Sequence, residues 1–260
     1  MTTNRILLAA LALLFIPITT GLALTVLDDD HADLEFEFNG TDWDVEIHHD
    51  DLGHFDPWEA VLVAYDEAFP VGARYTRPAG ADWDFIGVGS GETFFHIPLN
   101  EEPGIIYPGV EIEGPFAAYT ESADSRVSGE ATWVSLHLRD IVYHGDGIGH
   151  FSMWTVDASS NPIVWMSTAD GGITAEDRLI IEAGQHAHVA WGFSDLGFYE
   201  IMFEASGYID DGDGLVLVES GWYTFNFGIG TTAIPEPSTY AALFGLITLV
   251  VAGIYRRKRR

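Results

Sequence analysis

Short segments in which apolar and polar residues alternate, or in which β-branched residues cluster, recur along this chain and constrain its fold more than any other feature. Turn-forming residues such as Asn39-Gly40 and Asp146-Gly147 separate these segments, and no convincing 3.6-residue period appears. We therefore expect an all-β protein, most simply an antiparallel β-sandwich over residues 24–230. The predicted strands are residues 34–38, 43–47, 60–64, 93–97, 132–138, 151–156, 163–166, 178–181, 186–192, 198–205, 215–218 and 222–228.

The body of the chain is large enough to form its own core. About 210 residues remain once the two terminal segments described below are set aside, which suits one large domain or two small ones. Cysteine is absent, so disulfides and thiolate metal sites are excluded. Burial of apolar surface must therefore stabilise the fold.

The body carries a large excess of negative charge. Between Val26 and Pro235 the sequence has 39 Asp and Glu residues but only five Arg and no Lys. Nucleic acids are therefore not expected partners, because their phosphates would be repelled. Two explanations of the acidic excess stay open: solubility, including in a salty habitat, or a surface that collects divalent cations.

The N-terminus has the pattern of a secretory signal. Arg5 is the only charged residue before the apolar run 6–16, Pro17 interrupts that run, and the small residues Gly21 and Ala23 follow. We predict that residues 1–23 are a cleaved signal peptide. The alternative is an uncleaved membrane helix, although the run is shorter than the roughly 20 residues that a span needs. In both cases residues 24–234 lie outside the cytoplasmic membrane.

The C-terminus combines three features in order. Pro235, Glu236 and Pro237 precede an uncharged apolar run, and a helix over about residues 238–255 would be roughly 27 Å long, enough to cross a thin bilayer. The basic cluster comprises Arg256, Arg257, Lys258, Arg259 and Arg260, and we expect it in the cytoplasm.

This tail resembles the PEP-CTERM sorting signal of Gram-negative bacteria that make exopolysaccharide. The resemblance implies exosortase as a partner and a stage at which the helix holds the protein in the cytoplasmic membrane. The processed protein would then lie at the cell surface or in the extracellular matrix.

Two pairs of residues in the body have the spacing of metal ligands. His31 and Asp33, like His186 and His188, are two positions apart, and such residues share one face of a strand about 7 Å apart. Each pair can supply half of a tetrahedral site, and Zn²⁺ suits imidazole with one carboxylate. The alternative is that His186 and His188 only bind backbone carbonyls beside Trp191.

The body resembles the bacterial surface-anchored domains grouped as choice-of-anchor M. The segment 184–199, GQHAHVAWGFSDLGFY, carries most of the likeness, and residues 31–34, 85–109 and 147–154 add to it. The family pattern is not followed at Phe95 and His96. The resemblance implies a β-rich extracellular domain, sometimes found near zinc-uptake systems, with no established catalytic activity. It also implies a ligand set of His31, Asp33, His186 and His188, with His150 as a weaker fifth member.

Two further segments have weaker patterns. His48, His49 and His54 lie in an acidic stretch and can hold a second metal loosely or simply form a solvated turn. Residues 210–214, DDGDG, suit calcium by their alternate carboxylates, but they lack the rest of an EF-hand loop and favour a hairpin turn.

Three functions remain open on the sequence alone. The first is a non-catalytic exported surface or matrix protein that binds zinc. The second is a carbohydrate-binding module of the exopolysaccharide matrix, with exposed tryptophans that stack on sugars. The third is a secreted metal-dependent hydrolase, which needs an open coordination position and a general base. The candidate tryptophans are Trp43, Trp58, Trp83 and Trp222.

Overall fold

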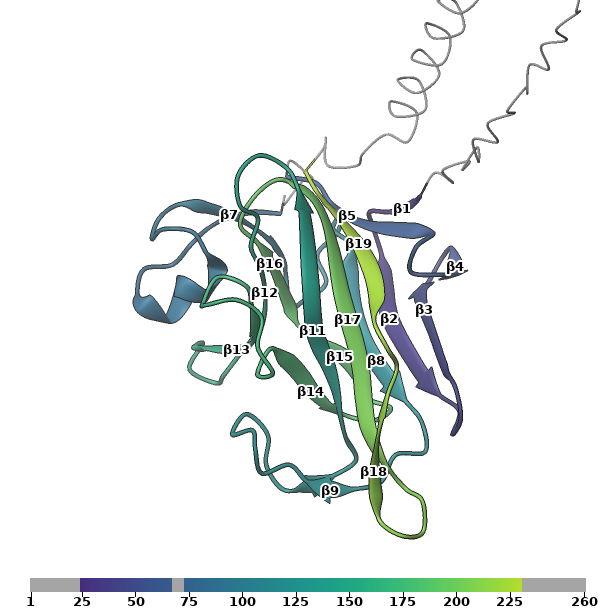
Figure 1. Cartoon of the computed structure of the whole chain (residues 1–260). Coiled ribbons are helices and arrows are strands. Elements are labelled where there is room, and N and C mark those ends of the chain that lie inside the picture. The colour runs from purple at the N-terminus through teal and green to yellow at the C-terminus, as the bar shows by residue number, and fades with distance from the viewer. Residues whose placement is uncertain (1–23, 67–72, 231–260) are drawn as a thin grey trace, which may run out of the picture. The chain divides into compact units, whose positions relative to one another are not determined.

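The computed structural model describes residues 24–66 and 73–230 (Figure 1). Apart from one 3₁₀ helix, η1 (Ala81–Ile86), every regular element of this part is a strand, which confirms the all-β class. Among the described residues, no helix is long and apolar enough to span a membrane. The predicted signal peptide and the predicted helix at about 238–255 lie outside the described residues.

One layer of the fold is a seven-stranded sheet, here called sheet A. Its long central strands β17 and β11 form ten residue pairs, with a bulge near Arg139. Strand β18 pairs with the C-terminal half of β17. The strands along the sheet are β1 (Thr25–Leu27), β5 (Ala60–Ala64), β19 (Tyr223–Ile229), β17 (Gly197–Asp210), β11 (Trp133–His144) and β14 (Arg178–Glu182), with β18 (Leu215–Glu219) beside β17.

Two five-stranded sheets pack against sheet A. Sheet B consists, in order, of β15 (His186–His188), β8 (Tyr107–Glu113), β2 (His31–Phe38), β3 (Trp43–His49) and β4 (Gly53–Phe55). Sheet C consists of β13 (Pro162–Ser167), β12 (Phe151–Val156), β16 (Ala190–Phe193), β7 (Thr93–Ile97) and β6 (Arg74–Thr76). A small two-stranded sheet joins β9 (Tyr119–Thr120) and β10 (Glu130–Ala131).

The sheets are mixed, and the expectation of a wholly antiparallel sandwich is wrong. Strand β5 runs parallel to both of its neighbours, β1 and β19, and β2 runs parallel to β8. The predicted strand 186–192 is also two strands, since the chain leaves sheet B after His188 and enters sheet C at Ala190. Strands β15 and β16 therefore link the two smaller sheets.

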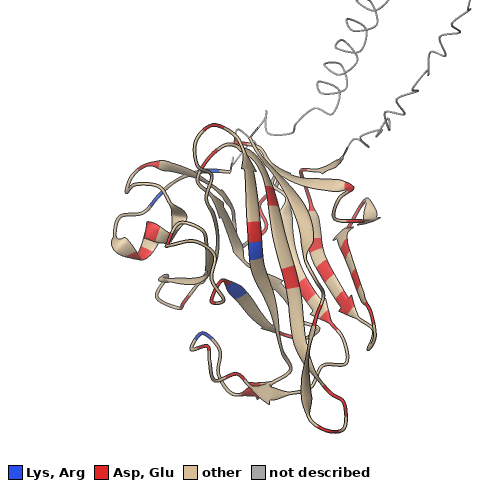
Figure 2. Ribbon diagram, viewed as in Figure 1, with Lys and Arg blue, Asp and Glu red and all other residues tan. Residues whose placement is uncertain are grey.

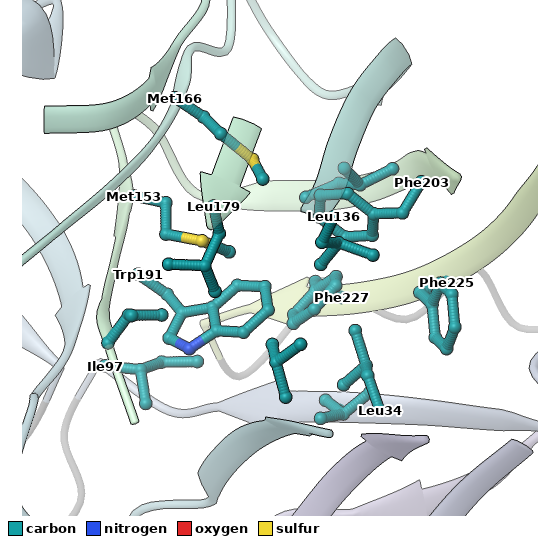
Figure 3. Packing of buried hydrophobic residues seen from close by; sticks show 14 of the residues in the cluster. Leu34, Ile97, Leu136, Met153, Met166, Leu179, Trp191, Phe203, Phe225 and Phe227 are labelled. Atoms are coloured by element: carbon teal, nitrogen blue, oxygen red, sulfur yellow. The ribbon is translucent and has the colours of Figure 1, made fainter. Parts of the chain in front are cut away.

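The three sheets share one hydrophobic core. Trp191 of sheet C lies 5.3 Å from Phe227 of sheet A between ring centroids (Figure 3). Phe36 of sheet B lies 5.7 Å from Phe225 of sheet A. All four side chains are at most 1% exposed. Full burial of each such side chain stabilises the fold by about 1.5–3 kcal/mol. This shared core fixes sheet B with one face inward and the other toward solvent.

Strand alternation decides what the outer face of sheet B carries. In β2 the residues Ala32, Leu34, Phe36 and Phe38 are buried in the core, so His31, Asp33, Glu35 and Glu37 project from the opposite face. Strands β3 and β8 alternate in the same way. Figure 2 shows the resulting acidic bands across neighbouring strands of this sheet. The outer face of sheet B is therefore lined with carboxylates and imidazoles.

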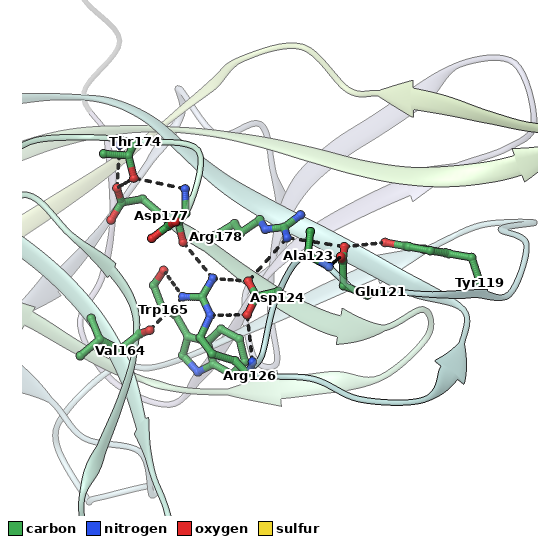
Figure 4. A network of polar contacts seen from close by, with 11 residues as sticks. Tyr119, Glu121, Ala123, Asp124, Arg126, Val164, Trp165, Thr174, Asp177 and Arg178 are labelled. Atoms are coloured by element: carbon green, nitrogen blue, oxygen red, sulfur yellow. Dashed lines mark hydrogen bonds and ion pairs between the residues drawn. The ribbon is translucent and has the colours of Figure 1, made fainter.

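All five arginines of the described residues form ion pairs with carboxylates. The most connected is Arg126, whose guanidinium binds Asp124 with Nη2–Oδ2 2.6 Å and donates to the carbonyls of Val164 and Trp165 at 2.9 and 3.1 Å (Figure 4). These bonds tie the segment between β9 and β10 to β13. The pairs are Arg74–Asp66, Arg77–Asp84, Arg126–Asp124, Arg139–Glu204 and Arg178 with Glu121 and Asp124. The remaining acidic surface is left without arginine partners.

Candidate metal centre

Strand pairing brings the two predicted ligand pairs together on the outer face of sheet B. Strand β8 lies between β2 and β15, and its residue Gly109 is the register partner of both Asp33 and His188. Because Gly109 has no side chain, groups from β2 and β15 can meet above it. We call His31, Asp33, His186 and His188 the three-histidine site.

Three ligand atoms of this site converge closely. Nε2 of His31 lies 3.1 Å from Nε2 of His186 and 3.3 Å from Oδ1 of Asp33, while His186 Nε2 also contacts Asp33 Oδ1. In tetrahedral zinc sites with bonds of about 2.0–2.1 Å, ligand atoms are separated by roughly 3.3 Å. His188 offers a third imidazole nitrogen within 4.8 Å of those of His31 and His186. The spacing therefore suits a tetrahedral ion.

Asp50 orients the imidazole of His31. Its Oδ1 lies 3.3 Å from His31 Nδ1, which directs the opposite nitrogen, Nε2, toward Asp33 and His186. A carboxylate bound to the second ring nitrogen is the usual support of a metal-binding histidine, since it fixes the tautomer and raises the basicity of the ligand. Asp50 follows β3 directly, and its backbone NH donates to the carbonyl of His31 at 3.2 Å.

His188 is held in its neutral form. Burial lowers its pKa to about 4, and the neighbouring His186 and His31 act in the same direction. Its ring stacks on Tyr107, with centroids 3.9 Å apart and planes inclined by 7°. Its Nδ1 is buried and has no hydrogen-bond partner among the described residues. A neutral imidazole at neutral pH is the form that binds a metal ion.

Asp33 is a buried carboxylate whose loss of hydration is only partly offset by contacts within the protein. It is 4% exposed, and its Oδ1 has no hydrogen bond of good geometry among the described residues despite its contacts with His31 and His186. Burial raises its pKa, and the two histidines partly oppose that change. A buried carboxylate without hydrogen bonds costs free energy, which a bound cation would offset.

Gly109 keeps the space between the ligands open. A Cβ atom at this position would collide with Asp33 Oδ1 and His186 Nε2 and lie 2.8 Å from His186 Cδ2. Any other residue would therefore fill the volume into which the ligands project. No local sequence pattern reveals this role, and only the pairing of β8 with both neighbours makes it visible.

Glu111 is a further residue that the sequence analysis missed. It is the register partner of His186, and one of its oxygens lies within 4.8 Å of the ligand atoms of Asp33 and His186. Burial raises its pKa, and Glu113 contributes to the increase. The alternation Tyr107, Gly109, Glu111, Glu113 was a usable signal for an outward face, but Pro108 and Gly109 are unusual within a strand.

The structure places the predicted fifth ligand, His150, outside the three-histidine site. Its ring packs against Gly87, where a Cβ would lie 2.8 Å from His150 Cδ2, and its Nδ1 is 3.4 Å from Thr168 Oγ1. Among the described residues, His150 belongs to none of the groups with metal-ligand spacing. Its position next to β12 in sheet C, rather than sheet B, explains the separation.

The remaining sequence candidates divide between structural and exposed positions. His49 is buried and binds the carbonyl of Asp29 at 3.0 Å, whereas His48 and His54 lie on the outer face of sheet B. The Asp210–Gly214 segment is the β17–β18 turn, in which Asp211 Oδ1 accepts from the NH groups of Asp213 and Gly214 at 2.9 and 3.1 Å.

The four candidate tryptophans differ in exposure. Trp58 and Trp222 are 61% and 62% exposed. Trp43 packs against Phe38 with centroids 5.1 Å apart, and Trp83 lies edge-on to Trp154 at 6.4 Å. Two of the four are thus available for stacking on a sugar, and the other two contribute to packing.

The comparisons with known proteins identify the C-terminal tail. Residues 233–260 match the family model described as the PEP-CTERM protein-sorting motif. The motif indicates an exported protein that exosortase processes and that is sorted to the cell envelope, as predicted from Pro235, Glu236 and Pro237. Searches of curated proteins and of solved structures found no significant match. The likeness of the body to choice-of-anchor M domains stays a prediction.

Proposed function

We propose that this exported protein is a non-catalytic surface or matrix protein that binds one Zn²⁺ ion at the three-histidine site. The observation that carries the proposal is the convergence of His31 Nε2, His186 Nε2 and Asp33 Oδ1, at 3.1 and 3.3 Å for the two distances from His31. With His188 these residues provide three imidazoles and one carboxylate. This donor set favours zinc over calcium and magnesium, which prefer oxygen ligands.

The electrostatics of the site support the proposal. Asp33 Oδ1 is buried and contacts only the two histidine nitrogens, without a hydrogen bond of good geometry. His188 Nδ1 is buried without a hydrogen-bond partner among the described residues. Buried polar atoms normally have partners, so two such atoms in one cluster point to a missing ligand. A divalent cation would stabilise the ionised form of Asp33 and use the lone pair of a neutral imidazole.

The ligand count favours binding over hydrolysis. Four protein ligands complete a tetrahedral shell, whereas catalytic zinc sites use three and keep the fourth position for water. The alternative of a secreted hydrolase requires that one of the four residues stays unbound. Glu111, next to His186, would then be the candidate general base.

The carbohydrate-binding alternative rests on other residues. Trp58 and Trp222 are largely exposed, and large apolar surfaces that face solvent are suited to sugar rings. Both lie away from the three-histidine site in the chain, in the segments that precede β5 and β19. The exopolysaccharide matrix is the proposed partner in that case.

Zinc titration of the purified full chain tests the main proposal. We expect one tightly bound zinc ion, and we expect the double variant His186→Ala/His188→Ala to lose it. His144→Ala is the matched control, because His144 also contacts a carboxylate, Glu200, at 3.2 Å but joins no group of metal ligands among the described residues. Unchanged zinc binding by the double variant would exclude this site and the hydrolase together.

Two assays separate the alternatives once metal binding is known. Hydrolysis of esters, peptides or glycans by the zinc-loaded chain would favour the enzyme. Glycan binding that persists after chelation and is lost in Trp58→Ala/Trp222→Ala would favour the carbohydrate-binding module.

A further inference from the structure

A second cluster of imidazoles and carboxylates lies on the same outer face of sheet B, on the other side of β2. We call Glu35, Glu46, His48 and His54 the β3–β4 cluster. Glu35 of β2 is the register partner of Glu46 in β3, and His48 of β3 is the partner of His54 in β4. The cluster therefore spans three adjacent strands.

The side chains of this cluster are drawn together. His54 Nδ1 lies 2.7 Å from Glu46 Oε1, and His48 Nδ1 lies 3.2 Å from Glu35 Oε1. The two imidazole rings stack, with centroids 4.4 Å apart and planes inclined by 3°. Ligand atoms of Glu35, Glu46 and His54 lie within 4.8 Å of one another. Four potential ligands thus surround one small region.

Each carboxylate of this cluster contacts an imidazole but has no arginine partner among the described residues. Glu35 and Glu46 are directly opposite each other on neighbouring strands, and like charges in that relation destabilise a sheet. All five arginines of the described residues are paired elsewhere. A divalent cation between the two carboxylates would attract both of them and offset their mutual repulsion.

We propose that Glu35, Glu46 and His54, assisted by His48, form a second divalent-metal site that is weaker than the three-histidine site. His54 is 57% exposed and Glu46 is 33% exposed in their side chains, whereas Asp33 of the first site is 6% exposed. A ligand set that is more exposed is less preorganised and better solvated, so it binds more weakly. Two carboxylates and an imidazole accept Zn²⁺ and also Mn²⁺.

The two sites share the strand β2 but use different neighbours. The first takes its remaining ligands from β15, and the second takes them from β3 and β4. Asp33 lies between them, since its carboxylate is also within 4.8 Å of ligand atoms of Glu35 and His48. The outer face of sheet B would then carry two metal ions side by side. The proposed ligands of the second site are all different from those of the first.

Calorimetric titration of the full chain with Zn²⁺ tests this proposal. We expect two classes of binding, with the weaker class lost in Glu46→Gln/His54→Ala while the tighter class stays unchanged. His186→Ala/His188→Ala should show the reverse pattern, so failure of one site is distinguishable from failure of the other. The matched control is Glu200→Gln/His144→Ala. It removes another exposed His–Glu pair, in which Nε2 and Oε1 are 3.2 Å apart, and it should keep both classes of zinc binding.

A single class of binding in the wild-type chain would overturn the second site. Two classes that survive in Glu46→Gln/His54→Ala would also overturn it, because the second ion would then lie elsewhere. Thermal unfolding of each variant without metal, compared with that of the wild type, establishes that the variants fold. Glu46→Gln alone provides a milder change, and we expect it to weaken the second class by at least tenfold.

Discussion

Nε2 of His31 and Nε2 of His186 lie 3.1 Å apart although the two residues are 155 positions apart in the chain. Two imidazole nitrogens at this distance can form one hydrogen bond only if a single proton lies between them. Asp33 Oδ1 contacts both nitrogens, so three basic atoms face one point. A metal ion at this point would be sensitive to changes in the residues that surround it.

Replacement of Gly109 by Ala is expected to block zinc binding without removing a ligand. The added Cβ would collide with Asp33 Oδ1 and His186 Nε2, so it would fill the position between them. The backbone of Gly109 does not have a positive φ, so alanine fits its conformation. Calorimetric titration with Zn²⁺ should show a loss of affinity of at least tenfold at the three-histidine site.

The control for this variant is Gly89→Ala. Gly89 also lacks a positive φ, and the nearest atom to its Cβ would be Oε2 of Glu92, at 2.9 Å, at the end of a long side chain. Wild-type affinity in Gly109→Ala would contradict the proposed position of the metal.

Replacement of Asp50 by Asn should weaken zinc binding while all four proposed ligands remain. Asp50 Oδ1 lies 3.3 Å from His31 Nδ1 and holds Nε2 toward the site. Loss of such a supporting carboxylate commonly costs 10–100-fold in affinity, and we expect about tenfold because Asp50 is half exposed. Asp51→Asn, at the neighbouring exposed position, serves as the control and should bind zinc normally. Equal affinities in the two variants would show that Asp50 does not support His31.

The faces of the strands could be predicted from the sequence. In His31–Phe38 the alternation of Ala32, Leu34 and Phe36 with polar residues defines a core face and an outer face, and the structure has this arrangement. The two-residue spacing of His31 with Asp33 then follows from strand geometry. The structure brings His31, Asp33, His186 and His188 to the same face of sheet B, and their binding of a metal ion stays a prediction.

The pairing of distant strands could not be predicted in this way. Strand β8 was missed because Pro108 and Gly109 interrupt the usual pattern of a strand, yet β8 is the strand that separates β2 from β15. The contributions of Gly109 and Glu111 were missed with it. His150 was assigned to the site by family resemblance, and no local pattern reveals that β12, the strand that follows it, belongs to another sheet.

Lowering the pH from about 6.5 to about 4 should destabilise the protein through His96. This residue of β7 stacks on Trp154 with centroids 4.9 Å apart, and its Nε2 is buried without a hydrogen-bond partner among the described residues. Burial lowers its pKa from 6.5 to about 4. Between these values the unfolded chain binds a proton that the folded chain does not, so stability falls as the pH falls.

His96 should account for up to about 3 kcal/mol of the unfolding free energy lost across this range. Chemical denaturation at several pH values gives the unfolding free energy of the wild type and of His96→Phe as a function of pH. The difference between the two slopes against pH measures the contribution of His96. Phenylalanine keeps an aromatic ring against Trp154 but has no titratable group. Parallel slopes for the two proteins between pH 4 and 6.5 would contradict the assignment.

We predict that the C-terminal segment is removed close to Pro235 in the exported protein. Residues 233–260 match a sorting motif, and the arginines of the described body are already paired to carboxylates. A body with so large an acidic excess, held a few residues from the membrane, would face anionic headgroups unfavourably. Cleavage removes that repulsion.

Intact-mass measurement of the protein isolated from the cell envelope and from the matrix tests this prediction. The expected mass lacks the segment that follows Pro235, including the basic cluster Arg256–Arg260. Replacement of Pro235 and Pro237 by Ala should leave the uncleaved form in the membrane fraction, because exosortase would no longer recognise the motif. Wild-type protein in the matrix with Arg260 still attached would show that sorting proceeds without cleavage.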